Sequence, residues 1–386
     1  MMIRSPKEKT MLYFFRNISK TIAALFLVGC CSLCLAATHY TALIDAGSSG
    51  SRMYVFQHQI DKKKIVNIEL LGSQKIKPGL STFADDPKNI NNYLLPLIDF
   101  AKKTLGSKTP ERAVKFYLLA TAGMRLISPH QQKTIYAAVK NSIKTNSQFH
   151  ISAIETIPGK YEGAYLWIAA NYLNQSLTPQ KTYAVMDMGG ASTQITFATN
   201  NSAGSDNNLH FLVDSNYFNV SSTSYLGLGQ NQARNQYAND PNCFPINYPL
   251  PNDKSGAGSY SLCAKDVAAL VKNVRKISPQ IPANMKTFAL SGFYYLASSD
   301  PFHLTGDFSA QTLQTKGTKF CATNWANIEK QYGNNSHLYS YCFNAAYFNQ
   351  LLTKGYGFDA TNNFITTDSI SGQSIAWPLG ALIYSI

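Results

Sequence analysis

The sequence has few charged residues and no pattern of histidine and cysteine that suggests a structural zinc site. Only 14% of its 386 residues are charged and 45% are hydrophobic, so the chain can build one large or two ordinary globular domains without relying on cross-links. Its seven histidines show no zinc-like spacing with the cysteines. No run of lysine and arginine resembles a nucleic-acid-binding arm, although the formal net charge is +13. We therefore expect no nucleic-acid partner, and the basic excess suits solubility or the steering of polyanionic substrates.

The first 36 residues differ from the rest. Five basic residues precede an uncharged run over residues 21–37 that ends in small residues, which predicts a secretory signal peptide over 1–36. The apolar core of this run is short for a bilayer span, so a mature start near Ala37 and a secreted, periplasmic or extracellular protein are expected. The alternatives are a lipobox over 27–30 that would leave Cys30 lipidated on a membrane, and an uncleaved anchor.

Four cysteines remain beyond the leader, an even number that suggests two disulfides in an exported chain. They are Cys243, Cys263, Cys321 and Cys342. Three connectivities are open, and we favour Cys243 with Cys263 and Cys321 with Cys342, because each pair closes a loop of about 20 residues.

The strongest organisational signal is an internal echo. Residues 40–47 (YTALIDAG) recur as residues 182–189 (TYAVMDMG), and both end an apolar strand with Asp-x-Gly. Each then passes through small residues into a second alternating strand, over 52–57 and 194–198, so each is a strand, tight turn, strand unit. The offset is far too long for a solenoid repeat. We expect two related domains whose turns face each other across a shared cleft.

Short β-like runs alternate with helical stretches along the chain. Strands are expected at 42–45, 53–56, 115–120 and 182–187, and helices at 92–105, 130–145 and 162–173. This alternation indicates α/β architecture with partly parallel sheets. Residues 203–258 are rich in Asn, Ser, Gly and Pro and predict a loop-heavy surface.

The two turns carry groups that suit phosphate. Asp45 leads a turn of glycines and serines, whose backbone N–H groups and hydroxyls can donate to phosphate oxygens. The turn is not a Walker loop, since no Gly-Lys-Ser/Thr ends it, and alone it would be explained as an ordinary hairpin. Its repetition favours a clamp in which Asp45 and Asp187 face a shared Mg²⁺ or Ca²⁺, often through water.

Two other segments offer matching chemistry. Thr121 and Arg125 follow a strand, where they would donate to phosphate and neutralise its charge. Glu162 lies at the start of a helix, which favours its ionised form and suits a general base, although helix capping alone is the alternative explanation. Gln194 would orient the attacking water beside Glu162, or it is a strand surface residue.

Four motifs in order resemble the apyrase conserved regions of the nucleoside triphosphate diphosphohydrolase (ecto-apyrase) family. They are DAGSSGSR at 45–52, LLATAGMR at 118–125, GKYEGAYLW at 159–167 and VMDMGGASTQITF at 185–197. Further similarity at 225–234, 288–295, 341–347 and 376–380 extends the resemblance over about 42–382.

This resemblance implies an α/β fold of two RNase H-like lobes, as in actin, sugar kinases and heat-shock ATPases, with an interlobe cleft. Lobe I would be 37–175 plus 370–386, and lobe II 176–369. The implied activity is metal-dependent removal of terminal phosphates from nucleoside tri- and diphosphates, by one-step attack of water.

The resemblance also implies roles for single residues. Glu162 is similar to the base, Gln194 and Ser192 to water-positioning groups, and Asp45 and Asp187 to metal-site acids that act through coordinated water. The implied phosphate-binding residues are Ser48, Ser49, Gly50, Arg52, Thr121, Arg125, Gly189, Gly190 and Ala191. Tyr347 matches the position that stacks on the nucleobase, and packing is its alternative in a chain with 23 tyrosines.

The chain differs from the family pattern near its end, and three other functions compete with the apyrase interpretation. Pro378 lies inside the terminal motif and no membrane span follows it, so we expect a secreted bacterial-type member that is a monomer without an obligate protein partner. The rivals are an exopolyphosphatase or alarmone phosphatase, a non-catalytic binding protein, and a kinase or chaperone of the same fold. Export and the context of Tyr347 argue against the first, Glu162 with Gln194 against the second, and the leader against the third.

Overall fold

The computed structural model describes residues 37–61, 64–200, 206–213, 215–274, 281–282 and 285–385. The expected signal peptide over 1–36 and the alternative lipidation of Cys30 lie outside these residues. Within the described ranges, no helix combines the length and the apolar character needed to cross a bilayer.

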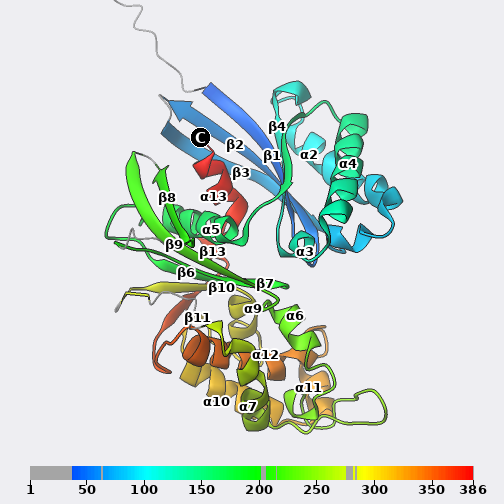
Figure 1. Ribbon diagram of the computed structural model, residues 1–386, viewed down its shortest axis with the longest axis vertical. Helices are drawn as coiled ribbons and strands as arrows, with labels where there is room; N and C mark the ends of the chain where they lie inside the picture. The colour runs from blue at the N-terminus through cyan, green and yellow to red at the C-terminus, as the bar shows by residue number, and fades with distance from the viewer. Residues whose placement is uncertain are drawn as a thin grey trace, which may run out of the picture.

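A five-stranded sheet forms one half of the molecule, in the order β3-β2-β1-β4-β5. Its strands are β1 (Ala37–Ala46), β2 (Ser51–Asp61), β3 (Lys64–Ile76), β4 (Lys115–Ala120) and β5 (His150–Thr156). Two helices, α2 (Ile90–Leu105) and α4 (Pro129–Asn146), cover its outer face (Figure 1). Buried Leu94, Leu97 and Ile98 give α2 the three- and four-residue spacing of one apolar stripe.

A seven-stranded sheet forms the other half, in the order β11-β12-β10-β6-β7-β9-β8. Its strands are β6 (Ala184–Met188), β7 (Ser192–Ala198), β8 (Asn208–Val213), β9 (Asn216–Leu226), β10 (Thr287–Ser291), β11 (Gly306–Phe308) and β12 (Phe364–Thr366). On its far side lie α6 (Gln230–Asn235), α7 (Tyr260–Val271), α9 (Gly292–Ala297), α10 (Ala310–Cys321), α11 (Trp325–Tyr332) and α12 (Tyr341–Gln350) (Figure 1).

Shorter elements join these layers. They are α3 (Ala122–Arg125), the β13 (Ser369–Ile370) and β14 (Gln373–Ser374) pair, and the single turns η1 (Leu80–Phe83), η2 (Pro87–Asn89), η3 (Glu111–Ala113), η4 (Pro241–Cys243), η5 (Leu338–Ser340) and η6 (Leu351–Gly355).

The two sheets repeat one arrangement. In each, the first strand pairs antiparallel with the second and parallel with a later one: β1 with β2 and β4, and β6 with β7 and β10. Asp45 lies opposite Arg52, and Asp187 lies opposite Gln194. Each turn is closed by one backbone hydrogen bond of 3.0 Å, from Gly47 N to Gly50 O and from Gly189 N to Ser192 O. The echo in the sequence is therefore a structural repeat, and both turns are hairpins as expected.

A third layer lies between the sheets. Helices α5 (Gly159–Leu173) and α13 (Trp377–Tyr384) pack against each other there (Figure 1). Their shared core includes the fully buried Trp167 and apolar residues of both sheets. The packing is close, because a Cβ on Gly380 would overlap the carbonyl oxygen of Tyr165. The expected lobe boundaries at 175 and 369 stay a prediction.

The expectation of loops over 203–258 is wrong for part of this segment. It contains β8 and the eleven-residue β9, which extend the second sheet. The centre of β9 buries Ser221, Ser222 and Thr223 among other polar positions, so its sequence lacks the apolar alternation that marks a half-buried strand. The three predicted helices are confirmed to within a few residues at their ends.

Both expected disulfides are confirmed. Cys243 bonds Cys263 and so ties η4 to α7, while Cys321 bonds Cys342 and ties α10 to α12. Both lie in the helical layer of the second half, where all four cysteines are buried.

The close contact between α5 and α13 generates a stability prediction. Gly380→Ala should lower the free energy of unfolding by about 1–3 kcal/mol, because the added methyl group has to push the two helices apart. Urea denaturation measures the change, with Ser385→Ala at the exposed end of the same helix as a control expected within about 0.5 kcal/mol of the parent. A Gly380→Ala protein as stable as the parent would contradict this packing.

Candidate active site

A cleft between the two halves collects most of the residues singled out in the sequence. Its lining includes Asp45, Ser48, Ser49, Gly50, Arg52, Thr121, Glu162, Asp187, Gly189, Gly190, Ala191 and Ser192. Arg125 and Gln194 do not line the cleft but contact Glu162 from behind it. The positions come from β1, β2, the junction of β4 with α3, α5, β6, β7 and the turns between paired strands, so the cleft forms only when both sheets and the middle layer are assembled.

The two turns face each other at close range. A Cβ placed on Gly190 would lie 2.7 Å from the hydroxyl oxygen of Ser48, and one on Gly123 would lie 2.8 Å from the Cα of Ser48. The absence of side chains at these glycines lets three backbone segments approach one small volume. Such an approach is what a phosphate group needs if backbone N–H groups from both turns are to reach it.

Two aspartates lie near the ends of equivalent strands, and each has one carboxylate oxygen without a hydrogen-bond partner among the described residues. The Oδ1 atoms of Asp45 and Asp187 are buried and have no hydrogen-bond partner among the described residues. Burial raises the pKa of Asp45 to about 7, against the opposing effect of Arg52 and Lys75, and raises the pKa of Asp187 to about 6. A buried carboxylate is stable when nearby positive charge or hydrogen-bond donors replace the lost water. Neither aspartate has enough of these among the described residues.

This donor set fits a hard divalent cation. Mg²⁺ and Ca²⁺ take carboxylate oxygens and complete their coordination with water and substrate phosphates. No cluster of three or more His, Cys, Asp or Glu residues able to hold a metal occurs in the described ranges. The two aspartates would therefore supply a small part of the coordination, consistent with binding through water.

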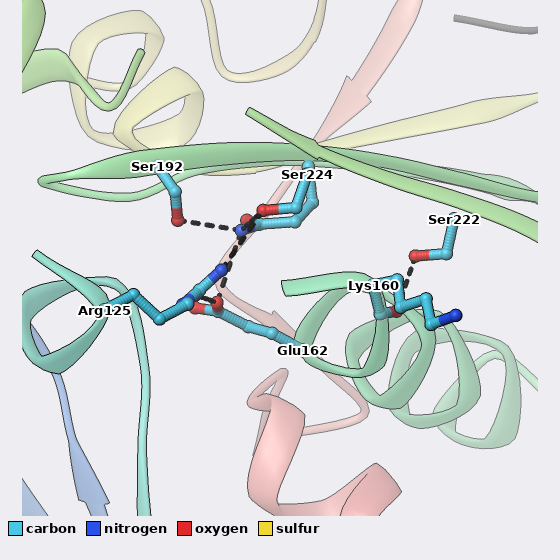
Figure 2. Close-up of polar contacts among 7 residues, drawn as sticks. Arg125, Lys160, Glu162, Ser192, Ser222 and Ser224 are labelled. Carbon is cyan, nitrogen blue, oxygen red and sulfur yellow. Dashed lines mark hydrogen bonds and ion pairs between the residues drawn. The ribbon is translucent and has the colours of Figure 1, made fainter. Parts of the chain in front are cut away.

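Glu162 lies in the first turn of α5, as expected, and is only 8% exposed. Arg125 forms an ion pair with its Oε2 atom, and Gln194 Nε2 donates to the same oxygen over 3.3 Å (Figure 2). Burial raises the pKa of Glu162 to about 8, while the charge of Arg125 acts to lower it. Both protein donors approach Oε2, and Oε1 has no hydrogen bond to another described residue. Oε1 is therefore the oxygen open to an incoming proton.

Gln194 is the second member of this group. Its side chain is 1% exposed, so the alternative of a strand surface residue is wrong. Its Nε2 lies 2.8 Å from Ser192 Oγ and 2.9 Å from Ser224 Oγ, besides its contact with Glu162 (Figure 2). Its Oε1 is buried without a partner among the described residues. A water molecule beside it would find an acceptor that no protein group uses.

Arg125 has a partner that the sequence did not suggest. It pairs with Glu162, and its Nη1 lies 3.4 Å from Ser224 Oγ. Its Nε atom is buried and has no partner among the described residues. The expected contact between Arg125 and phosphate stays a prediction.

The structure places Tyr347 in the packed core of the second half, and its expected stacking on a nucleobase stays a prediction. Tyr347 is 0% exposed, its hydroxyl donates to Leu228 O over 2.6 Å, and its ring packs on Phe343 with centroids 5.5 Å apart. Nine of the ten residues of α12 are buried, and none of its residues is among those that line the cleft. Packing, the alternative reading of Tyr347, is the one that the structure supports.

Several cleft residues escaped the sequence reasoning. Tyr294, Tyr295, Ser291 and Lys75 line the cleft, and Tyr295 is 60% exposed. Both tyrosines lie in residues 288–295, a segment that resembles the ecto-apyrase family, and this resemblance could have identified them. Lys75 belongs to no motif and is placed only by its pairing opposite Arg52 on β2. Ser291 adopts a φ of 56°, which is unusual for a residue with a side chain.

Comparisons with known proteins agree with this geometry. The sequence profile of the GDA1/CD39 (nucleoside phosphatase) family matches residues 32–242 and 252–386. The nucleoside-diphosphatase mig-23 of Caenorhabditis elegans is 29% identical over 425 residues, covering 89% of this chain and 76% of that protein. The nucleoside-triphosphatase ntp-1 of the same organism is 29% identical over 398 residues, covering 89% and 73%. Probable apyrase 4 of Arabidopsis thaliana is 28% identical, covering 89% and 79%.

Solved structures support the fold. Nucleoside triphosphate hydrolase from Neospora caninum matches with a TM-score of 0.70 at 17% identity, covering 96% of each chain. A Ppx/GppA family member from Aquifex aeolicus matches with a TM-score of 0.56 at 15% identity, covering 90% of this chain and 98% of that one. The expected two-lobed α/β fold of the actin type is thereby confirmed.

The environment of Glu162 predicts its titration. Its carboxyl group should be protonated below about pH 8 and ionised above it, because burial disfavours the charge. Carbon-13 NMR of the glutamate carboxyl groups measures this, with Glu162→Gln assigning the signal. Arg125→Gln should move the midpoint upward, since the guanidinium favours the ionised form. A midpoint near that of an exposed glutamate, or a downward shift in Arg125→Gln, would contradict the burial and the ion pair.

Proposed function

Because the chain belongs to the GDA1/CD39 (nucleoside phosphatase) family, we propose that it is a metal-dependent apyrase. It hydrolyses the terminal phosphates of nucleoside tri- and diphosphates, such as ATP, ADP, GTP and GDP, to nucleoside monophosphate and phosphate. One observation carries this proposal: Glu162, Gln194 and Ser192 meet beside two facing turns of phosphate-binding character. Relatives named as nucleoside-diphosphatase, nucleoside-triphosphatase and apyrase support it.

The phosphate chain is held by both turns. Backbone N–H groups and the hydroxyls of Ser48 and Ser49 on one side, and of the turn at 189–191 on the other, donate to phosphate oxygens. Thr121 adds a hydroxyl donor, and Arg52 adds positive charge from β2. Donors fixed by the fold need little reorganisation as negative charge develops on the transferred group, which lowers the barrier.

The chemical step is attack of water on the terminal phosphorus. Gln194 Oε1 and Ser192 Oγ orient the water, and Oε1 of Glu162 takes one of its protons in the ionised form of the enzyme, whose fraction grows as the pH rises toward about 8. The bond from the water oxygen to phosphorus forms as the bond to the bridging oxygen breaks, and the nucleotide leaves with the negative charge on that oxygen. Glu162 then releases its proton to solvent. No covalent phosphoenzyme is required.

Asp45 and Asp187 would hold Mg²⁺ or Ca²⁺ through water at the ends of β1 and β6. When bound, the cation would supply positive charge to neutralise the oxygens of the phosphate chain. The protein contributes two carboxylates that must be ionised near the substrate. Their raised pKa values show that burial makes this ionisation less favourable than in water.

The site of action is outside the cytoplasm in this proposal. Two disulfides and the leader-like first 36 residues support secretion or a periplasmic location, with lipid anchoring at Cys30 as the alternative. The protein acts as a monomer on small nucleotides, with no nucleic acid and no obligate protein partner.

Product analysis with a base variant tests this function. The mature chain should convert both ATP and ADP to AMP with Mg²⁺ or Ca²⁺ and should be inactive in EDTA. Glu162→Gln should lower kcat by about 10²–10⁴-fold, because it cannot accept the proton. The matched control is Glu155→Gln, an exposed glutamate on β5 outside the cleft, which should keep parental activity. Hydrolysis of polyphosphate but not of ADP, or full activity of Glu162→Gln, would overturn the proposal.

The two tyrosines separate base binding from packing. Tyr295→Ala should raise KM for ATP by about 5–150-fold, as expected for a lost stacking partner, and leave KM for inorganic tripolyphosphate unchanged. Tyr347→Leu removes the buried ring and its hydrogen bond, so it should lower stability by about 1–4 kcal/mol and leave both KM values unchanged. Steady-state kinetics and urea denaturation measure the two effects. The reverse pattern would assign base stacking to Tyr347 instead.

A further inference from the structure

We propose that Ser224 on β9 is a positioning residue that fixes Gln194 and Arg125 around the general base. This inference rests on the proposed function of the same site. Ser224 does not line the cleft, and it precedes the 225–229 similarity without belonging to any motif read from the sequence. It acts through the side chains that it contacts.

The hydroxyl of Ser224 closes a ring of polar contacts. Its Oγ accepts from Gln194 Nε2 over 2.9 Å and from Arg125 Nη1 over 3.4 Å (Figure 2). The same two side chains approach Oε2 of Glu162, Arg125 as its ion-pair partner and Gln194 Nε2 over the longer distance of 3.3 Å. One small hydroxyl therefore contacts both groups that hold the base, and none of these three residues lines the cleft.

Gln194 needs this restraint because its amide can otherwise turn. An amide nitrogen carries two hydrogens, and Gln194 Nε2 has three acceptors within reach, in Ser192, Ser224 and Glu162. With Ser192 and Ser224 at 2.8 Å and 2.9 Å, the amide plane is fixed and Oε1 stays free of protein partners. Loss of Ser224 would leave one of these two short bonds unmade and release the orientation of Oε1.

The backbone explains why serine occupies this position. Ser224 lies directly opposite Gln194 in the β7 and β9 pairing, so its side chain starts next to the amide it binds. The start of α5 leaves little room beside it, because a Cβ on Gly159 would overlap both the Arg125 guanidinium and Ser224 Oγ. A short side chain with one hydroxyl fits this space, and the glycine at 159 makes the approach of α5 compatible with it.

The test compares Ser224→Ala with Ser221→Ala on the same strand. Ser221 is buried, whereas Ser224 is partly buried, and the Ser221 hydroxyl has no partner among the described residues, so its removal should change neither rate nor stability much. Ser224→Ala should lower kcat for ATP by roughly fivefold, the order expected for one neutral hydrogen bond, with KM unchanged. A purely structural role would instead lower stability or raise KM, and equal kcat in parent and Ser224→Ala would overturn the proposal.

A double-mutant cycle tests the route of the effect. In a Gln194→Ala background, the further change Ser224→Ala should lower kcat by much less than fivefold, because only its weaker contact with Arg125, at 3.4 Å, is left to lose. Undiminished loss in that background would show that Ser224 acts in another way and would contradict the proposal.

A crystal structure of Ser224→Ala separates this inference from the proposed function. If the parent hydrolyses no nucleotide, the apyrase proposal fails, and the positioning role is then decided by geometry alone. A Gln194 amide that turns or becomes disordered supports the role. An amide that keeps its contacts with Ser192 and Glu162 overturns it.

Discussion

The active site depends on one buried carboxyl group, that of Glu162, which lies between the two sheets and must still be able to ionise. Burial of a charged group is costly unless charge and hydrogen bonds replace water. Arg125 brings the charge from α3, which follows β4, Gln194 brings the amide from β7, and Glu162 itself comes from α5 in the middle layer. Three layers therefore meet at one oxygen atom, and the close packing of α5 on α13 fixes where that atom lies.

The internal repeat supplies the rest of the cleft. Equivalent strands end in Asp45 and Asp187, and equivalent turns follow them with the same closing hydrogen bond. The halves differ where the chemistry needs them to differ: opposite the first aspartate stands Arg52, and opposite the second stands Gln194. One half is thus equipped to hold charge and the other to orient water, on the same backbone plan.

Local pattern allowed much of this to be predicted from the sequence. The Asp-x-Gly echo located both hairpins, and the placement of Glu162 after a proline and glycine turn located the start of α5. Contacts between distant residues were not predictable in the same way. The pairing of Arg125 with Glu162 and the place of Lys75 depend on how strands align, which no local signal records. The surroundings of Tyr347 were not predictable either, because nearly all of α12 is buried and its sequence has no polar face to show which residues point into the core.

The central claim is direct attack by a water held beside Glu162, and the stereochemistry at phosphorus tests it most directly. The parent enzyme would hydrolyse ATP made chiral at the terminal phosphorus with sulfur and oxygen isotopes, and the configuration of the released thiophosphate would be determined. A single in-line displacement inverts that configuration, and inversion is the predicted result. Retention would require two displacements through a covalent phosphoenzyme and would contradict the assignment of Glu162 as a base acting on water.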